Sequence, residues 1–89
     1  MRYRIEVRGR RGDHAPYTYT QYDRVKAAKV QRLIDKTVIE VAQHESGGQR
    51  LPMARFIDGI EDRDGFIPVT VRFKEYDIEF TVLATPILE

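Results

Sequence analysis

The residues of this chain best suited to binding chemistry lie in a short basic segment near its start. Arg8-Gly9-Arg10-Arg11-Gly12 is followed by His14, and Tyr17 and Tyr19 come soon after. Guanidinium groups bind phosphates, and tyrosine rings that point outward can stack on bases. The pattern therefore indicates a nucleic-acid-binding loop. Its candidate residues are Arg10, Arg11, His14, Tyr17 and Tyr19.

The same segment has a plainer interpretation, in which Tyr17 and Tyr19 face the core and the arginines are only solvated. Nucleic-acid-binding domains usually carry a strong positive charge. The formal net charge of this chain is only +1. The orientation of the two tyrosines decides between these interpretations.

A second group of basic residues recurs at helical spacing. Lys29, Arg32 and Lys36 fall at i, i+3 and i+7, which places them on one face of a helix. Val25 and Ile39 lie among them, away from the main apolar stripe. Apolar anchors amid positive charge favour a surface that binds a protein with an acidic face, although single exposed apolar residues are ordinary. The residues expected to contact a protein partner are Val25, Lys29, Arg32, Lys36 and Ile39 on the helix, with Arg8, Arg10 and Arg11 on the loop.

Charge is divided along the chain, and this division allows self-association. Residues 1–36 contain ten basic and four acidic residues, whereas residues 37–89 contain five basic and ten acidic residues. A basic half attracts acidic partners or polyanions, and the acidic half of one copy can attract the basic half of another. A homodimer is therefore a further expectation.

Residues for catalysis and metal binding are scarce. The chain has no Cys, one Ser (Ser46) and two His, and it shows no phosphate-loop, dinucleotide-binding or zinc-protease motif. Asp58, Glu61, Asp62 and Asp64 do not follow the spacing of a calcium-binding loop and are interpreted as a solvated turn. We expect no enzyme activity, no metal and no cofactor. An enzyme or ligand-binding site that forms only at a subunit interface is the remaining alternative.

The candidate surfaces lie on strands and on one helix, which can be predicted from the spacing of apolar residues. Arg2–Arg8 alternates charged and apolar residues as a half-buried strand does, residues 9–16 form a loop, and Tyr17–Tyr22 is the second strand of a hairpin. Asp23 can cap a helix that runs to about Glu45. The apolar stripe of that helix consists of Val30, Leu33, Ile34, Thr37, Val38 and Val41.

Three more strands are expected after the helix. Met53–Ile57 forms the first of them, followed by a turn over residues 61–65. In the last two strands, Phe73 opposes Ile78 across a tight turn, and this register brings both apolar sets to one face. Pro68 indicates that its strand lies at a sheet edge or begins to pair after the proline.

These elements predict one α+β domain of order β-β-α-β-β-β, with a long helix on a mainly antiparallel sheet of four to five strands. Its parts are a hairpin over 1–22, a helix over 23–46, a three-stranded segment over 51–85 and a tail over 86–89. No stretch is apolar enough to span a membrane and no secretory signal is visible, so a cytoplasmic location is expected.

The function expected from these observations is that of a small non-enzymatic protein-interaction module. Such a module acts as an inhibitor or adaptor by masking a partner's surface, and its size and plain composition also suit a protein of phage or mobile-element origin. Nucleic-acid binding through the basic hairpin loop is the first alternative.

Overall fold

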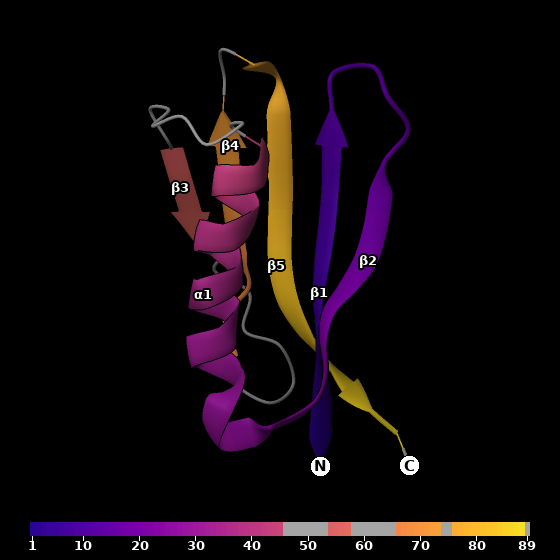
Figure 1. The fold of residues 1–89 in the computed structure, drawn as a ribbon, viewed down its shortest axis with the longest axis vertical. Coiled ribbons are helices and arrows are strands. Elements are labelled where there is room, and N and C mark those ends of the chain that lie inside the picture. Colours follow the sequence, from indigo (N-terminus) through magenta and orange to yellow (C-terminus); the bar gives the residue numbers. More distant parts are fainter. Residues whose placement is uncertain (46–53, 58–65, 74–75, 89) are drawn as a thin grey trace.

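The computed structural model describes residues 1–45, 54–57, 66–73 and 76–88. It confirms a single α+β domain in which one helix packs on an antiparallel sheet. Five strands form the sheet in the order β2-β1-β5-β4-β3 (Figure 1). The elements are β1 (Arg2–Arg11), β2 (Tyr17–Lys26), α1 (Ala27–Glu45), β3 (Ala54–Ile57), β4 (Val69–Phe73) and β5 (Ile78–Ile87).

The centre of the sheet is a long pairing between the first and last strands. β1 and β5 pair without interruption from Arg2 opposite Ile87 to Arg11 opposite Ile78. On the other side of β5, Phe73 pairs with Ile78, which confirms the expected register of the last hairpin. Pro68 directly precedes β4, an interior strand, so pairing begins after the proline.

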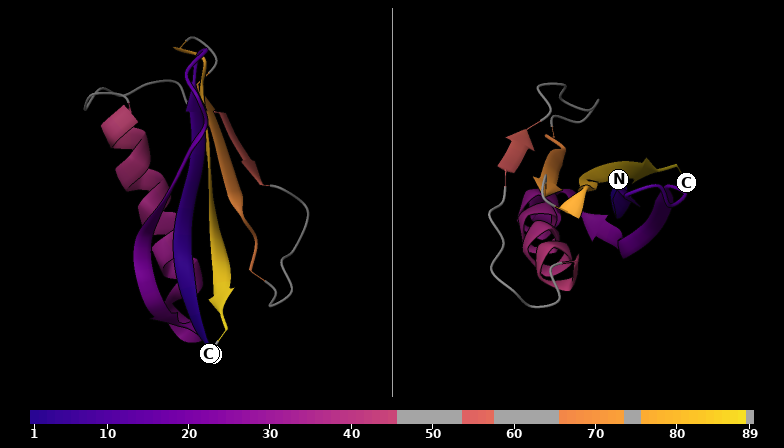
Figure 2. Two further views of the ribbon diagram at one scale, coloured as in Figure 1. Left: turned by 90° about the vertical axis from the view of Figure 1, so that its right-hand side faces the viewer. Right: turned by 90° about the horizontal axis from the view of Figure 1, so that it is seen from above.

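One face of the sheet forms the core against α1. Alternation along β1, β4 and β5 turns every second side chain toward the helix, and these side chains are buried. The helix covers only this face, as the two views of Figure 2 show. No described element covers the opposite face, which we call the open face. The buried apolar residues are Tyr3, Ile5, Val7, Val25, Val30, Ile34, Val38, Val41, Val69, Val71, Phe73, Ile78, Phe80, Val82 and Ala84.

The helix begins four residues later than expected. β2 continues to Lys26, and its pairing with β1 shifts register twice, between Tyr3 and Ile5 and between Ile5 and Glu6. Arg24 has a φ of 52°, which marks the irregular part of the strand. The two shifts keep Tyr22 and Val25 on the helix side, where strict alternation from Tyr17 would not place both.

Both ends of the central strand pair extend further than the sequence suggests. β1 runs to Arg11, so the expected loop over 9–16 is reduced to residues 12–16. Pro86 and Ile87 belong to β5 rather than to a tail. Gly47, Gly48, Met53, Lys74 and the acidic residues 58–64 lie outside the described residues. Within the described part of the chain, no helix is long and apolar enough to cross a membrane.

Candidate functional site

The arginines expected to share one flexible loop are divided between the two faces of the sheet. Because β1 continues through Arg11, side chains alternate across the strand at these positions. Arg8 and Arg10 lie on the open face, where they line a hollow together with Thr18 and Thr81. Arg11 lies on the helix side and forms an ion pair with Glu45. Extended backbone pairing with β5 is the physical reason for this division.

On the helix side, Glu45 joins the end of α1 to the hairpin. Its carboxylate accepts a hydrogen bond from the Tyr17 hydroxyl at 3.0 Å and another from the Arg11 guanidinium. The Glu45 side chain is only 10% exposed. Burial, the hydrogen bond to Glu45 and the charge of Glu45 raise the pKa of Tyr17 to about 12. The phenol therefore stays protonated as a donor at neutral pH.

Gly9 makes room for the Tyr17 ring. The two residues pair across β1 and β2, and a Cβ atom at position 9 would lie 2.4 Å from the Tyr17 hydroxyl oxygen. Any side chain at this position would therefore displace the ring. Only glycine permits this close approach of Tyr17 to the strand.

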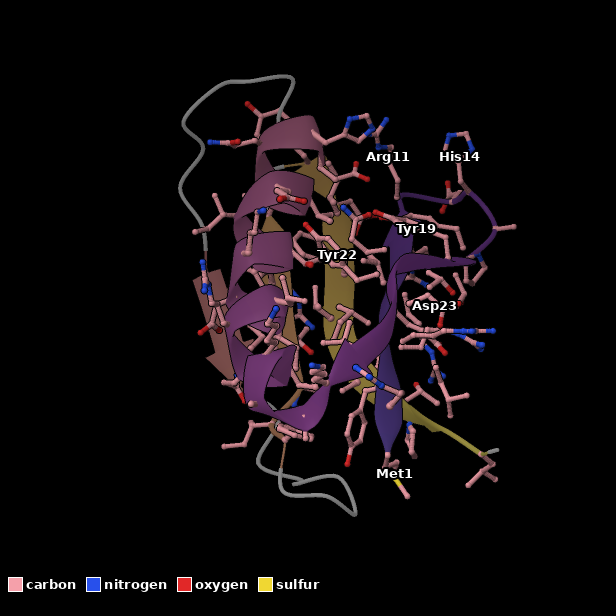
Figure 3. The ribbon with its side chains drawn as sticks, turned by 60° about the horizontal axis from the view of Figure 1, so that its bottom comes forward. Met1, Arg11, His14, Tyr19, Tyr22 and Asp23 are labelled. Carbon is pink, nitrogen blue, oxygen red and sulfur yellow. The ribbon has the colours of Figure 1, made fainter. Side chains whose placement is uncertain are left out.

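The other two tyrosines of β2 also face the helix. Tyr19 stacks on Tyr17 with ring centroids 6.0 Å apart, and burial followed by the charge of Glu45 raises its pKa. The Tyr22 hydroxyl donates to Glu40 at 3.2 Å, as does the Gln21 amide at 3.0 Å. Figure 3 shows Tyr22 between β2 and α1. Tyr19 is the most exposed of the three, at 41%.

The five residues expected to form a nucleic-acid-binding loop therefore do not share one surface. Arg10 is on the open face, whereas Arg11, Tyr17 and Tyr19 are on the helix side, and the first two of these are bonded to Glu45. His14 is exposed on the hairpin turn, away from the helix (Figure 3). The prediction of one basic and aromatic surface was therefore wrong, because the structure divides these residues between two separate surfaces.

The open face carries a row of arginines from β1. Arg2, Arg4, Arg8 and Arg10 alternate with the buried residues of the strand. Arg4 lies 3.6 Å from Asp23, and Arg8 lies 3.4 Å from Glu6. Threonines from β2, β4 and β5 lie on the same face, and among them Thr70 and Thr81 share a hydrogen bond of 2.9 Å. Around β1 the described part of this face is predominantly basic, although Glu6 and Glu79 also lie on it and Leu83 of β5 lies opposite Glu6.

The sequence predicted five partner-binding residues on the helix, and four of them lie on the outer face of α1. Lys29, Arg32, Lys36 and Ile39 are all exposed, Ile39 at 60%. Lys36 forms an i, i+4 ion pair of 3.8 Å with Glu40. Val25 is the exception, because it lies on β2, pairs with Tyr3 and is only 7% exposed. Val25 belongs to the core and not to a contact surface.

The free edge of β2 is a feature that the sequence patterns did not single out. Among the described residues, β2 is the terminal strand of the sheet and pairs with β1 alone. Its segment Tyr17–Tyr22 has no charged residue, no proline and no glycine, and Thr18, Tyr19 and Thr20 are all exposed. Natural edge strands are usually protected by charges, prolines or bulges. Here the register shift at Gln21, the irregular part at Arg24 and the charged residues protect the far end of β2, whereas Tyr17–Thr20 pairs with β1 in regular register.

The described residues provide little for metal binding or catalysis. Among them, no group of three or more histidine, aspartate or glutamate side chains could hold a metal ion. His14 and His44 lie on different elements, the hairpin turn and the last turn of α1. A hollow of about 270 Å³ beside His44 is lined by Tyr19, Gln21 and Glu40, whose polar groups include the carboxylate already bonded to Tyr22.

No family model, curated protein or solved structure matches this chain. Its functional assignment therefore rests on the surfaces described above. Of the residues that build them, Glu40, Glu45 and Thr81 had no local signal in the sequence, because their roles depend on contacts between distant segments. Arg2 and Arg4 did have one, since they alternate with the apolar residues of the first strand.

Proposed function

We propose that this protein is a non-enzymatic protein-interaction module that binds an extended segment of its partner along the free edge of β2. The single observation that carries the proposal is the uncharged edge segment Tyr17–Tyr22, of which Thr18, Tyr19 and Thr20 are exposed. Unpaired N–H and C=O groups of an edge strand are a template for another strand. Strand addition is a common mode of peptide recognition, with main-chain hydrogen bonds supplying affinity.

The two ends of this segment limit the register that a partner can adopt. Pro16 precedes it, and the irregular part of β2 at Asp23 and Arg24 follows it. A register shift at Gln21 also divides the segment, so the regular part available for pairing is Tyr17–Thr20, a length of about 13 Å. Tyr19 and Thr20 project to opposite faces and offer one aromatic and one hydroxyl contact to the added strand.

The charge around the edge favours an acidic partner. Arg24 and Lys26 lie on the far end of β2, and Lys29 follows on the outer side of α1. Acidic residues that flank the partner's strand would be attracted to them, which increases the association rate and fixes the direction of pairing. By occupying such a segment, a small module masks it from other proteins and acts as an inhibitor or adaptor.

The experiment is an affinity capture from the native host's lysate after nuclease treatment, at low and high salt. We compare the wild type with the double variant Thr18→Lys/Thr20→Lys, in which both substituted side chains are exposed. Lysines on an edge strand oppose the addition of another strand. We expect a protein that survives nuclease and high salt on the wild type and is lost from the variant.

A matched control tests the outer face of the helix with the same change in charge. Ala28→Lys/Ile39→Lys places two lysines at exposed positions of α1. We expect this variant to retain the partner. Loss of the partner from the helix variant, with retention by the edge variant, would move the contact surface from β2 to α1 and overturn the strand-addition proposal.

A further inference from the structure

The open face of the sheet has the donors of a phosphate-binding surface. Arg2, Arg4, Arg8 and Arg10 project from the same side of β1. Two-residue steps along an antiparallel strand separate neighbouring side chains by about 6.8 Å, so the row from Arg2 to Arg10 is about 27 Å long. Arginine forms bidentate hydrogen bonds with phosphate oxygens and retains its charge at all physiological pH values.

The arginines of this row are available to a ligand. Arg2 and Arg10 form no ion pair with any other described residue. Arg4 forms an ion pair of 3.6 Å with Asp23, and its side chain is 42% exposed. Arg8 forms an ion pair of 3.4 Å with Glu6, and its side chain is 56% exposed. The pair of Arg4 with Asp23 is exposed at both partners and contributes little free energy, so a phosphate can replace Asp23 at small cost. Glu6 is only 12% exposed and lies in the row between Arg4 and Arg8, where it offsets part of the charge of Arg8.

A hollow at one end of the row collects several donors. It has a volume of about 370 Å³, and Arg8, Arg10, Thr18 and Thr81 line it together with Gly9, Pro16 and Tyr17. Two guanidinium groups and two hydroxyl groups thus face the same space. Glu79 also lines the hollow, but its carboxylate lies 3.2 Å from the Arg72 guanidinium on β4. The pairing with Arg72 offsets the repulsion that Glu79 would exert on an anion.

We propose that the open face binds the phosphate backbone of double-stranded nucleic acid, with Arg8, Arg10 and Thr18 around one phosphate. The length of the arginine row corresponds to about eight base-pair steps of about 3.4 Å. Single-strand-binding proteins depend on aromatic rings that stack on bases. Along β1, β2 and β5 the open face presents no aromatic ring, since Tyr17, Tyr19 and Tyr22 face the helix side and Phe80 is buried in the core.

Binding of this kind is independent of base sequence and depends strongly on salt. Contacts to phosphates position a protein on a duplex but do not read its bases. Each phosphate that is neutralised contributes about −0.9 to the slope of log K against log salt concentration. Two to four arginine contacts predict a slope between about −2 and −4.

The test measures binding affinity by fluorescence anisotropy over a series of salt concentrations. One probe is a labelled duplex of random sequence, about 20 base pairs long, and the other is one of its strands alone. We expect the duplex to bind more tightly than the single strand, with the slope given above. Tighter binding of the single strand, or no salt-dependent binding of the duplex by the wild type, would overturn the proposal.

Two double variants with equal changes in charge locate the surface. Arg8→Gln/Arg10→Gln removes two charges from the open face, and Lys29→Gln/Arg32→Gln removes two from the exposed face of α1. Losing two contacts reduces the slope by about 1.8, which is about 60-fold in affinity at 0.1 M salt if those contacts contribute nothing at 1 M. We expect the helix variant to stay within about threefold of the wild type. Equal losses in both variants would show an effect of net charge alone and contradict the site.

A second measurement avoids any loss of folding in the variants. In the wild type, NMR shifts on addition of the duplex are expected at the amides of β1 and β5 and at the arginine side chains of the open face. Shifts confined to α1 would refute the assignment. The single edge substitution Thr20→Lys separates this proposal from strand addition, because it leaves Arg8, Arg10 and Thr18 unchanged and is expected to weaken binding of the protein partner while the duplex is retained.

Discussion

The contact between Glu45 and the hairpin leads to a quantitative prediction for Glu45→Ala. The Glu45 carboxylate accepts hydrogen bonds from Tyr17 and Arg11, and its side chain is largely buried. The bond from Tyr17 to this charged acceptor contributes about 1.5 kcal/mol, the low end of the usual range, because the tyrosine is only half-buried. The Arg11 ion pair adds about 0.5 kcal/mol, since the arginine is more than half exposed.

A third effect opposes these two. Glu45 is the last residue of α1, where a negative charge is unfavourable to the helix dipole. Removing this charge raises the free energy of unfolding by about 0.5 kcal/mol. The net expectation is a loss of about 1.5 kcal/mol in the free energy of unfolding. For a chain of this length, that loss corresponds to a decrease in Tm of about 6–12 °C.

Urea and thermal unfolding of the wild type and Glu45→Ala measure this difference. Glu79→Ala is the matched control, because Glu79 also pairs with an arginine, Arg72, but both of these side chains are well exposed. We expect Glu79→Ala to cost less than about 0.5 kcal/mol. Equal losses for the two variants would refute the reasoning that burial and the bond to Tyr17 set the contribution of Glu45.

Three further predictions concern the same part of the fold and the core of the helix. Because the pKa of Tyr17 is raised from 10.0 to about 12, the unfolded chain loses this proton first, so stability is maintained below pH 10 and falls as the pH rises from about 10 to about 12. Tyr17→Phe should reduce that fall without abolishing it, because the pKa of Tyr19 is raised as well, and absorbance titration of tyrosinate should lose a late step. Gly9→Ala should displace the Tyr17 ring and lower the pKa of Tyr17 toward 10, and an unchanged titration would contradict the close approach. The Thr37 hydroxyl is buried without a hydrogen-bond partner among the described residues, so Thr37→Val should raise the free energy of unfolding by about 1 kcal/mol, measured by urea unfolding, and a decrease would indicate a hidden partner.

Local periodicity was sufficient for most of the secondary structure. The two-residue alternation of Tyr3, Ile5 and Val7 predicted β1, and the helical spacing of Val30, Ile34 and Val41 predicted α1. Alternating and helical patterns identify the face that must leave water, because burial of that face is the main favourable contribution to folding. These patterns require no knowledge of distant contacts.

The limits of the elements depended on partners far away in the sequence. Gly9 and Arg10 resemble a loop locally, but pairing with Phe80 and Glu79 extends the strand through them. At the start of the helix, Asp23 resembles a cap, yet pairing with β1 continues the strand to Lys26. Interstrand hydrogen bonds outweigh such local preferences, and they cannot be seen in a single segment.

The orientation of the β2 tyrosines was likewise decided by tertiary contacts. From the sequence, Tyr17 and Tyr19 could face either side of the sheet. The carboxylate of Glu45 and the space above Gly9 hold Tyr17 on the helix side, and Tyr19 stacks on it. No pattern within residues 17–22 contains that information, because Glu45 lies on the last turn of α1.

The sequence alone therefore determined the class of fold, the apolar faces and the arginine alternation of the first strand, since all of these follow from spacing along one segment. Only the tertiary structure decided the strand order, and with it the surfaces. It placed β2 at an edge, separated Arg10 from Arg11, and buried Val25. Strand order depends on which segments hydrogen-bond across the whole chain, and a binding surface exists only once that order is fixed.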